Sequence, residues 1–347
     1  MKITIGIPTY NRSGFLRQSI QSVLAQTYRN FRLIVSDNAS TDDTAEVVES
    51  FDDPRILYTR TDENIGMTAN FNRLLELADT EFVAVLYDDD LFYPEHLQYT
   101  TRVLEDHPSV GIVHTAFDII DKDGEILERA KMLVESSDVV SIEPGKRFLE
   151  RSMRQDWVML AASALFRTEA IVGVGGFPVE EEPLPDVPMF RRIALHWDLA
   201  SVSKPLAACR VHGDASSASH GTFTGLGYSA GDSYPGTMLR QRTQFIDEAS
   251  LPLNLEKRYR SIAEASFRRD MINRRANRAA SSGGWGSTNA ALARLIRTEP
   301  RSLFTPVTWR IVATQLGGRS VRRFLRRLTR GQTETKPRHP EPGSPRQ

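Results

Sequence analysis

Residues 82–97 read FVAVLYDDDLFYPEHL, a stretch in which an apolar run passes directly into a cluster of acidic side chains. Its first five residues are all apolar, which predicts a short strand buried on both faces. Asp88, Asp89 and Asp90 follow at the carboxyl end of that strand, where ligands collect in open α/β sheets. Because three adjacent carboxylates repel one another, the pattern favours a bound cation that compensates their charge.

The acidic cluster also has a simpler interpretation, an exposed turn that precedes the helix opening near Pro94 and Glu95. Solvent and the first amide groups of the helix would then stabilise the carboxylates. The loops that follow the neighbouring strands bear on this choice.

The composition predicts a globular protein with a substantial core, since 40% of the 347 residues are hydrophobic. Lys plus Arg and Asp plus Glu number 44 each, so the chain as a whole is not a binder of polyanions. The single cysteine, Cys209, excludes an internal disulfide and a cysteine-rich zinc site, and it fits a reducing, cytoplasmic compartment. Residues 1–8 read as a first strand and not as a signal peptide, and no window approaches about 18 uninterrupted apolar residues.

Three units of strand and helix precede the stretch at residues 82–97. They comprise strands at residues 3–7, 31–35 and 56–58 and helices at residues 16–24, 45–51 and 67–78. This alternation with short connections predicts an α/β fold with a parallel, doubly wound sheet whose polar loops gather on one edge.

Beyond residue 97 the pattern becomes a mixture of strands and helices. We predict strands at residues 111–114 and 206–211, a hairpin turn at residues 123–124, a helix at residues 148–153 and a buried apolar run at residues 159–166. Residues 216–235 are rich in Gly and Ser, which indicates a loop or lid. Residues 237–281 read as charged amphipathic helices.

Polar loops follow three of the predicted strands, at residues 8–12, 37–41 and 87–90. Because the carboxyl ends of parallel strands meet at one edge of a sheet, we expect these loops to form a single site. One such loop alone would be an ordinary turn.

With these motifs the sequence resembles the family 2 glycosyltransferases, which have the GT-A fold, from residue 2 to about residue 217. The resemblance depends on the order of six motifs: Pro8-Thr-Tyr-Asn-Arg12, Ser36-Asp-Asn-Ala-Ser-Thr-Asp42, Asn64-Ile-Gly66, the acidic triplet with Tyr93-Pro-Glu-His-Leu97, Gly175-Gly176-Phe177, and Arg210-Val-His212. It implies a GT-A type, doubly wound and mostly parallel sheet flanked by helices, with a mainly helical C-terminal extension.

The resemblance divides the chain into five segments. They are a nucleotide-sugar-binding half at residues 1–115, an acceptor-binding half of the same domain at residues 116–217, a flexible loop or lid at residues 218–236, a helical extension at residues 237–331 and a disordered tail at residues 332–347. Within the extension, residues 301–330 carry many arginines among large apolar residues and no acidic residue. This segment reads either as a contact with an anionic membrane on its inner face or as a solvated basic helix.

The activity implied is the transfer of a sugar from a nucleotide-diphosphate sugar to an acceptor hydroxyl, by a metal-dependent inverting displacement. The acceptor would be a glycan or a lipid-linked molecule in the synthesis of cell-surface polysaccharide, lipid-linked glycan or glycolipid, and no nucleic acid is involved. The cofactor would be Mg²⁺ or Mn²⁺, which bridges the diphosphate oxygens and stabilises the leaving group.

The resemblance assigns the nucleotide to the three loops. Asp37 would accept a hydrogen bond from a ring N–H of the base, Tyr10 would stack on the base or close over it, and Thr9 would line the same wall. Asp88 would contact the ribose or the metal shell. The remaining residues of the expected nucleotide site are Pro8, Arg12, Asn64 and Gly66.

Asp89 best matches the metal-binding aspartate of the family, with Asp90 and His212 as further candidates for the metal. His212 is equally compatible with a contact to the diphosphate or with a structural role. The family commonly has Asp-x-Asp-Asp at the triplet, whereas this chain has Tyr87 first, which leaves the second metal contact open.

Many members carry an arginine immediately before the asparagine that matches Asn72, and here Phe71 stands there. One contact with the diphosphate is therefore missing from the family pattern. Arg12, Arg73 or a residue of the lid would have to replace it.

Asp186 fits the position of the family's general base, in an acidic loop before a helix. The same loop offers Glu180, Glu181 and Glu182 as competitors, and Asp186 is also compatible with a simple helix cap. The turn formed by Gly175, Gly176 and Phe177 would shape the acceptor pocket.

Four other classes of protein share parts of this pattern. A sugar nucleotidyltransferase needs a Gly-rich phosphate loop after the first strand, and a dinucleotide oxidoreductase needs Gly-x-Gly-x-x-Gly there; residues 8–12 provide neither. A processive polysaccharide synthase needs transmembrane helices and a Gln-x-x-Arg-Trp motif. The alternative that remains is a catalytically inactive GT-A protein that binds carbohydrate or acts as a scaffold, which would lose the base or the metal site, whereas Asp186 and Asp89 are present.

Overall fold

The structure is a computed structural model that describes residues 2–131, 139–154, 161–181, 185–212 and 234–281. The chain divides into two compact units, residues 1–266 and residues 267–347. The described part of the second unit is the end of a helix, at residues 267–281. The residues of the candidate site all belong to the first unit.

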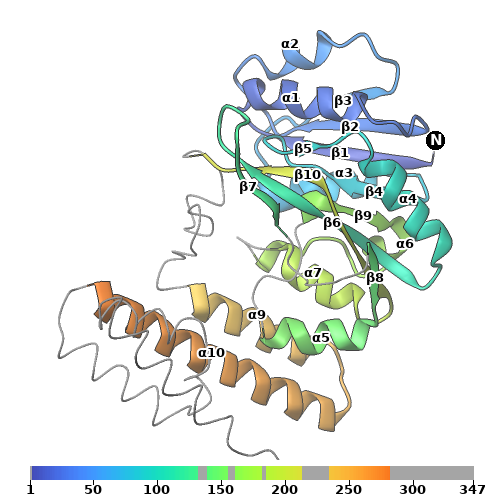
Figure 1. Cartoon of the computed structure of the whole chain (residues 1–347). Coiled ribbons are helices and arrows are strands. Elements are labelled where there is room, and N and C mark those ends of the chain that lie inside the picture. The colour runs from blue at the N-terminus through green and yellow to red at the C-terminus, as the bar shows by residue number, and fades with distance from the viewer. Residues whose placement is uncertain (1, 132–138, 155–160, 182–184, 213–233, 282–347) are drawn as a thin grey trace, which may run out of the picture. The chain divides into compact units, whose positions relative to one another are not determined.

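The amino-terminal part of the first unit alternates strands and helices, as Figure 1 shows. In chain order the elements are β1 (Ile3–Thr9), α1 (Ser13–Leu24), β2 (Phe31–Asp37), α2 (Thr44–Glu49), β3 (Ile56–Arg60), α3 (Met67–Glu76), β4 (Phe82–Val85), β5 (Leu91–Phe92) and α4 (His96–Asp106).

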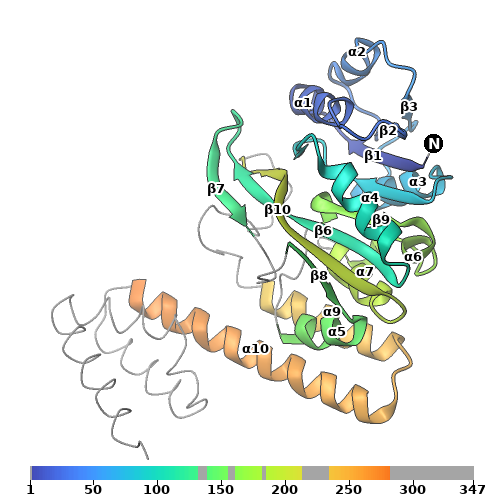
Figure 2. The same ribbon diagram turned by 45° about the vertical axis from the view of Figure 1, so that its right-hand side comes forward.

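The part that follows is mixed. Its elements are β6 (Val110–Ile120), β7 (Ile126–Lys131), β8 (Val140–Glu143), α5 (Gly145–Arg154), η1 (Ala161–Ser163), β9 (Ala164–Arg167), α6 (Thr168–Val172), η2 (Val179–Glu181), α7 (Asp186–Ile193), β10 (Asp198–Arg210), α9 (Tyr234–Glu248) and α10 (Leu253–Ser281). In Figure 2 the β6–β7 hairpin and β10 are seen from the side.

The strands form one sheet in the order β3-β2-β1-β4-β9-β6-β10-β5, with β7 paired to β6 and β8 paired to β10. Strands β1, β2, β3 and β4 are parallel to one another, and β6 is parallel to β10. Because β9 is antiparallel to both β4 and β6, these two strands run in the same direction. The carboxyl ends of β1, β2, β4 and β10 therefore reach the same edge of the sheet.

Helices cover both faces of this sheet, as a doubly wound fold requires. Strand β1 is buried along its whole length, and Ile5 belongs to the same apolar cluster as Ile20 of α1. On the other face α3 approaches so closely that a Cβ at Gly6 would lie 2.9 Å from a methyl carbon of Leu74. Glycine is thus required in the middle of β1 by the helix that packs on it.

The expected α/β fold class, a central sheet flanked by helices with a helical C-terminal extension, is confirmed. Three features go beyond the expectation. Strand β9 inserts antiparallel between β4 and β6, β10 is longer than the strand predicted at residues 206–211, and β6 runs across the boundary expected at residue 115.

Some of the expectations concern residues that the structure does not describe. They include most of the loop or lid at residues 218–236, the basic segment at residues 301–330, the tail at residues 332–347, and Glu182. Within the described residues, no helix has the length and apolar character needed to span a bilayer.

Candidate nucleotide-sugar and catalytic site

The loops after β1 and β2 are joined by hydrogen bonds of Asn11. Its backbone adopts a left-handed conformation, with φ of 53°, and its N–H donates to Ser40 Oγ at 2.9 Å. Its side-chain Oδ1 accepts a hydrogen bond from the Thr41 N–H at 2.7 Å. Asparagine tolerates this backbone region better than most residues, so the motif residue serves the loop geometry.

Asn38 joins the loop after β2 to the expected nucleotide residues Asn64 and Gly66. Its amide nitrogen donates to Asn64 Oδ1 at 2.9 Å and to the Gly66 carbonyl at 3.2 Å, while its Oδ1 accepts from the Ile65 N–H at 2.9 Å. Three of the sequence motifs thus form one connected surface at the edge of the sheet.

Asp37, the expected reader of the base, is buried and already has two hydrogen bonds. Oδ1 accepts from the Ser40 N–H at 2.8 Å, and Oδ2 accepts from the Tyr58 hydroxyl at 2.6 Å. Burial and this hydrogen bond to Asp37 raise the pKa of Tyr58, so the phenol stays protonated as a donor. The contacts fix the carboxylate in place, and Tyr10 beside it is 44% exposed.

The carboxylates of Asp88 and Asp89 lie together at the end of β4, and both are buried. Arg12 Nη1 lies 2.8 Å from Asp89 Oδ2 and 3.2 Å from Asp88 Oδ1. His212 Nε2 lies 3.2 Å from the same Asp89 Oδ2. Burial, followed by the charge of Asp89, raises the pKa of Asp88 to about 7.

Asp90 has different contacts from its two neighbours. Its Oδ1 accepts a hydrogen bond from the Arg210 N–H at 2.8 Å, which ties the triplet to the end of β10. Burial and the charge of Asp89 raise the pKa of Asp90 well above the usual value. The structure therefore brings His212 to Asp89, whereas it brings Asp90 to the backbone of β10.

The backbone of the triplet is held by residues that the sequence analysis did not identify. Ser19 of α1 is fully buried, and its hydroxyl lies 2.6 Å from the Asp90 carbonyl and 2.9 Å from the Asp88 carbonyl. Gln26, two residues beyond the end of α1, donates to the Tyr93 carbonyl at 2.8 Å. Arg210 Nε donates to the Asp89 carbonyl at 2.8 Å.

A signal for these α1 residues was present in the sequence. Ser19, Ser22 and Gln26 are spaced by three and four residues, which places them along one side of a helix beside its apolar stripe. Their side chains satisfy backbone groups of the segment after β4, including the N–H of Phe92 in β5.

We predict that Ser19→Ala lowers the free energy of unfolding by about 1–3 kcal/mol, because it leaves buried carbonyls without a donor. Urea unfolding followed by circular dichroism measures the change. Thr27→Ala is the matched control, since Thr27 is a partly exposed hydroxyl residue beyond the end of the same helix. Equal effects of the two substitutions would contradict the role given to Ser19.

Asp186, the expected base, is the first residue of α7 and is 6% exposed. Its Oδ1 accepts a hydrogen bond from the Val187 N–H at 2.9 Å, and burial raises its pKa to about 6. After burial, the charge of Asp186 is the largest cause that raises the pKa of Tyr87, the residue before the acidic triplet. Met189 and Phe190 of α7 belong to an apolar cluster against which Tyr87 also packs, so α7 and the segment after β4 border the same cluster.

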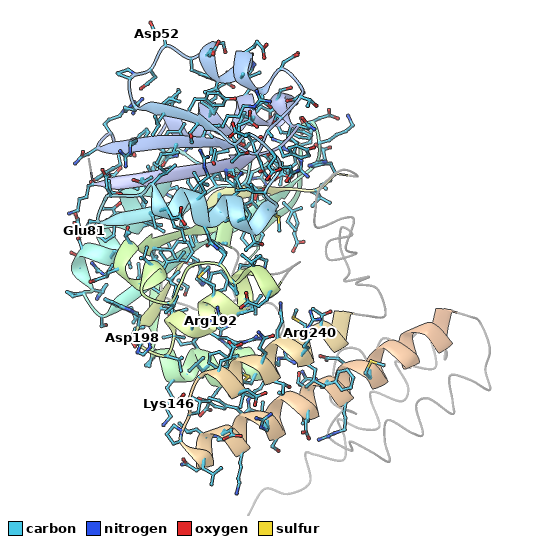
Figure 3. The ribbon with its side chains drawn as sticks, turned by 180° about the vertical axis from the view of Figure 1, so that it is seen from behind. Asp52, Glu81, Lys146, Arg192, Asp198 and Arg240 are labelled. Carbon is cyan, nitrogen blue, oxygen red and sulfur yellow. The ribbon has the colours of Figure 1, made fainter. Side chains whose placement is uncertain are left out.

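The competing acid Glu180 has different surroundings. Glu180 has a side chain that is 59% exposed and lies 3.6 Å from Arg192, the α7 residue labelled in Figure 3. Arg192 also pairs with Glu248 of α9 at 2.9 Å. Glu181 is the last residue of the short helix η2.

The Gly175-Gly176-Phe177 turn is clamped by Asn72 of α3. Asn72 Nδ2 donates to the Phe177 carbonyl at 2.7 Å, and the Phe177 N–H donates to Asn72 Oδ1 at 2.8 Å. Gly176 has φ of +73°, and a Cβ there would lie 2.5 Å from Asn72 Oδ1. The Phe177 ring is buried against Phe71, so its side chain supports the turn from within the core.

A pocket of about 580 Å³ adjoins the carboxylates. Its lining includes Arg12, Phe15, Asp42 and His212. Arg73, considered above as a replacement for the missing arginine, instead donates to Ser36 Oγ at 2.6 Å, between β2 and α3. Of the two arginines considered, Arg12 is the one that contacts the acidic residues.

No three His, Cys, Asp or Glu side chains in the described part of the chain are arranged as a complete metal shell. The donors that are present nevertheless fit a hard divalent cation. The Asp88 and Asp89 carboxylates and the His212 imidazole supply oxygen and nitrogen ligands of the kind that such an ion takes.

Comparison with known proteins identifies the relatives of this chain. The family model described as Glycosyl transferase family 2 matches residues 4–171. An uncharacterized glycosyltransferase of Rickettsia bellii is 34% identical over 128 residues, which are 37% of this chain and 18% of that protein. The putative glycosyltransferase EpsE of Bacillus subtilis is 31% identical over 126 residues, which are 35% of this chain and 45% of EpsE. The chain therefore spans less than half the length of either relative.

Two solved structures are similar over most of the chain. Residues 1–349 of S. aureus TarS, in complex with UDP-GlcNAc, give a TM-score of 0.57 at 19% identity and cover 91% of this chain and 84% of that one. The mannosyltransferase PcManGT from Pyrobaculum calidifontis, in complex with GDP-Man and Mn²⁺, gives a TM-score of 0.50 at 18% identity and covers 90% of this chain and 84% of that one. At this level of identity the likeness shows the fold, which is the expected GT-A type.

Proposed function

The chain belongs to glycosyl transferase family 2, whose model spans residues 4–171, and from this premise we propose that it transfers a sugar from a nucleotide-diphosphate sugar to an acceptor hydroxyl. The observations that support the proposal are the buried Asp186 carboxylate at the start of α7 and the Asp88–Asp89 pair after β4, two segments that border the same apolar cluster. One carboxylate group then faces the leaving diphosphate and another faces the acceptor.

Asp186 acts as the general base in this proposal. A carboxylate with a pKa near 6 is ionised at neutral pH and accepts a proton more readily than an exposed aspartate. The acceptor hydroxyl transfers its proton to Asp186 as its oxygen bonds to the anomeric carbon. Since the diphosphate leaves from the opposite side, the configuration at that carbon is inverted.

The leaving group is received by the cluster after β4. In this proposal Arg12 contacts phosphate oxygens, and Asp88, Asp89 and His212 hold the cofactor Mg²⁺ or Mn²⁺. The contacts of Arg12 and His212 with Asp89 support the assignment. When bound there, the divalent ion neutralises the charge that develops on the diphosphate. The complex of PcManGT with GDP-Man and Mn²⁺ supports this assignment.

Base recognition is assigned to Asp37 and Tyr10. Both oxygens of Asp37 have partners, yet each carboxylate oxygen has a second lone pair that can accept from a ring N–H of uracil, thymine or guanine. The exposed Tyr10 ring is free to cover the base. Gly175 and Gly176 border the acceptor side in this proposal, supported by Asn72.

A thermal-shift screen against UDP, dTDP and GDP, each with and without Mn²⁺, tests the proposed function. One of the nucleotides is expected to raise the melting temperature only when Mn²⁺ is present, with about 2.7 kcal/mol of stabilisation at 100 times its dissociation constant. Absence of a shift with all three nucleotides would contradict the proposal.

We also propose that residues 301–330 bring the enzyme to the inner face of the cytoplasmic membrane, where a lipid-linked acceptor in cell-envelope synthesis would be found. The arginines interleaved with large apolar residues support this assignment. Full-length protein is expected to pellet with anionic liposomes, less so at high salt, and a version ending at Pro300 is expected to stay in solution. Equal pelleting of the two would contradict it.

The alternative of an inactive carbohydrate-binding or scaffold protein has no observation in its favour. A protein without catalysis has no need for a buried carboxylate with a raised pKa near the acidic cluster.

A further inference from the structure

We propose that Arg12 is an exchangeable internal cation: it occupies the Asp88–Asp89 pair in the nucleotide-free protein, leaves when a divalent ion binds, and then contacts the diphosphate of the donor. The inference rests on the proposed function and concerns the order of events at the same site. It assigns to Arg12 two alternating partners.

The first observation is the sharing of one carboxylate oxygen. Asp89 Oδ2 lies 2.8 Å from Arg12 Nη1 and 3.2 Å from His212 Nε2. This is the oxygen that faces the imidazole, so it is also the oxygen that a cation held by Asp89 and His212 must use. A guanidinium and a divalent ion at this one oxygen repel each other, so binding of the ion favours the departure of Arg12.

The second observation is the anchoring of Arg12. Its backbone carbonyl accepts from the Phe15 N–H at 3.1 Å and from the Leu16 N–H at 3.0 Å, so the start of α1 holds the main chain in place. Its side chain is 22% exposed and lines the pocket of about 580 Å³. The long side chain thus has room to move away from the carboxylates while its backbone stays fixed.

The third observation is the different engagement of Arg210, the other arginine at the cluster. Its guanidinium donates to the carbonyls of Asp89, Asp121 and Lys122 and to Gln18 Oε1, at 2.8–3.1 Å. Arg210 is therefore part of the framework and 2% exposed. Arg12 contacts carboxylates, whose partner changes when a metal arrives.

The exchange explains how a buried acidic cluster stays folded without metal. Two neighbouring carboxylates need a positive partner, and the Arg12 guanidinium bridges both of them. When the divalent ion replaces it, the released guanidinium lies at the edge of the same site, where phosphate oxygens bind. Arginine suits this role because its planar fork binds carboxylate and phosphate in similar geometry.

The test measures Mn²⁺ binding to the full-length protein without nucleotide, by electron paramagnetic resonance of free Mn²⁺. Arg12→Gln is expected to bind Mn²⁺ at least tenfold more tightly than the parent, because the competing cation is gone. Arg12→Met, which keeps the apolar stem, is expected to do the same if Arg12→Gln fails to fold. Arg17→Gln is the matched control on α1, since Arg17 contacts Ser50 and not the cluster, and it is expected to leave Mn²⁺ affinity within twofold.

The second arm measures binding of UDP and of GDP by calorimetry at saturating Mn²⁺. Arg12→Gln is expected to lower the affinity for whichever nucleotide binds by at least tenfold, because the diphosphate loses its contact with the Arg12 guanidinium. A purely structural role of Arg12 does not produce both tighter binding of Mn²⁺ and weaker binding of the nucleotide in one variant.

Unchanged or weaker Mn²⁺ binding in both Arg12 variants, with measurable binding in the parent, would overturn the exchange and leave the proposed function intact. If no variant and no parent protein binds Mn²⁺, the metal assignment of the proposed function is itself wrong and the exchange is wrong with it. Unchanged nucleotide affinity in Arg12→Gln would overturn the contact with the diphosphate.

Discussion

Asp186→Asn is expected to lower turnover by about 10²- to 10⁴-fold while the affinity for the nucleotide-sugar donor stays nearly unchanged. Asparagine keeps the size of the side chain and can still accept the Val187 N–H, but it cannot take a proton from the acceptor. Single-turnover rates and donor binding by calorimetry separate the two quantities.

The other acids of the same loop provide the matched controls. Glu180→Gln and Glu181→Gln remove a carboxylate from η2 without touching the buried position at the start of α7. Glu182→Gln completes the set. Each is expected to change turnover far less than Asp186→Asn, and near-normal turnover in Asp186→Asn would overturn the assignment of the base.

The same substitution is expected to stabilise the fold, which distinguishes a base from a simple helix cap. Burial raises the pKa of Asp186 to about 6, above its ordinary value of 3.8, so its contribution to stability is present below about pH 4 and is lost as the pH rises through 6. Above that pH, Asp186→Asn is expected to increase the free energy of unfolding by at most about 3 kcal/mol. The gain should vanish near pH 4. A loss of stability at neutral pH would favour the capping role.

Asp89→Asn is expected to abolish turnover and to remove the dependence of nucleotide affinity on Mn²⁺. Asp89 is the carboxylate that both Arg12 and His212 contact. We therefore expect a divalent ion to bind to this carboxylate in place of Arg12. Titration of the nucleotide with and without Mn²⁺ measures the coupling. Parent-level sugar transfer by Asp89→Asn would show that the metal assignment is wrong.

Asp90→Asn is the matched comparison for Asp89. The Asp90 carboxylate accepts the Arg210 N–H, a bond that an asparagine oxygen can also accept. We therefore expect Asp90→Asn to retain the Mn²⁺ dependence and to reduce turnover much less. An equal loss of turnover and of Mn²⁺ dependence in both variants would mean that Asp90 belongs to the metal shell, as the sequence predicted.

The sequence predicted the edge of the sheet at which the site lies, because strand direction fixes it. The apolar run at residues 82–86 indicated a buried strand, and the three loops after β1, β2 and β4 do meet at one edge. The motif Arg210-Val-His212 reaches the same edge for the same reason, since β10 is parallel to β6 and β6 runs in the direction of β4.

The sequence could not separate the three aspartates of the triplet. Their chemistry is identical, and the rotation of the chain after β4 decides which carboxylate faces Arg12 and which faces β10. Nor could it predict the neighbours of β9, because a short apolar strand has no periodic signal that specifies its partners. Phe177 likewise reads as a pocket residue in the motif, whereas its ring packs in the core.

The most direct test of the central claim is the configuration of the first sugar product, observed by proton NMR. Purified full-length protein is incubated with Mn²⁺ and α-linked UDP-, dTDP- and GDP-sugars, with water or an added glycan as acceptor, and spectra are recorded before the released sugar can mutarotate. We predict that the donor that is consumed yields a β-configured product and that Asp186→Asn slows its formation by about 10²-fold or more. A product that retains the α configuration would contradict an inverting displacement with Asp186 as the base.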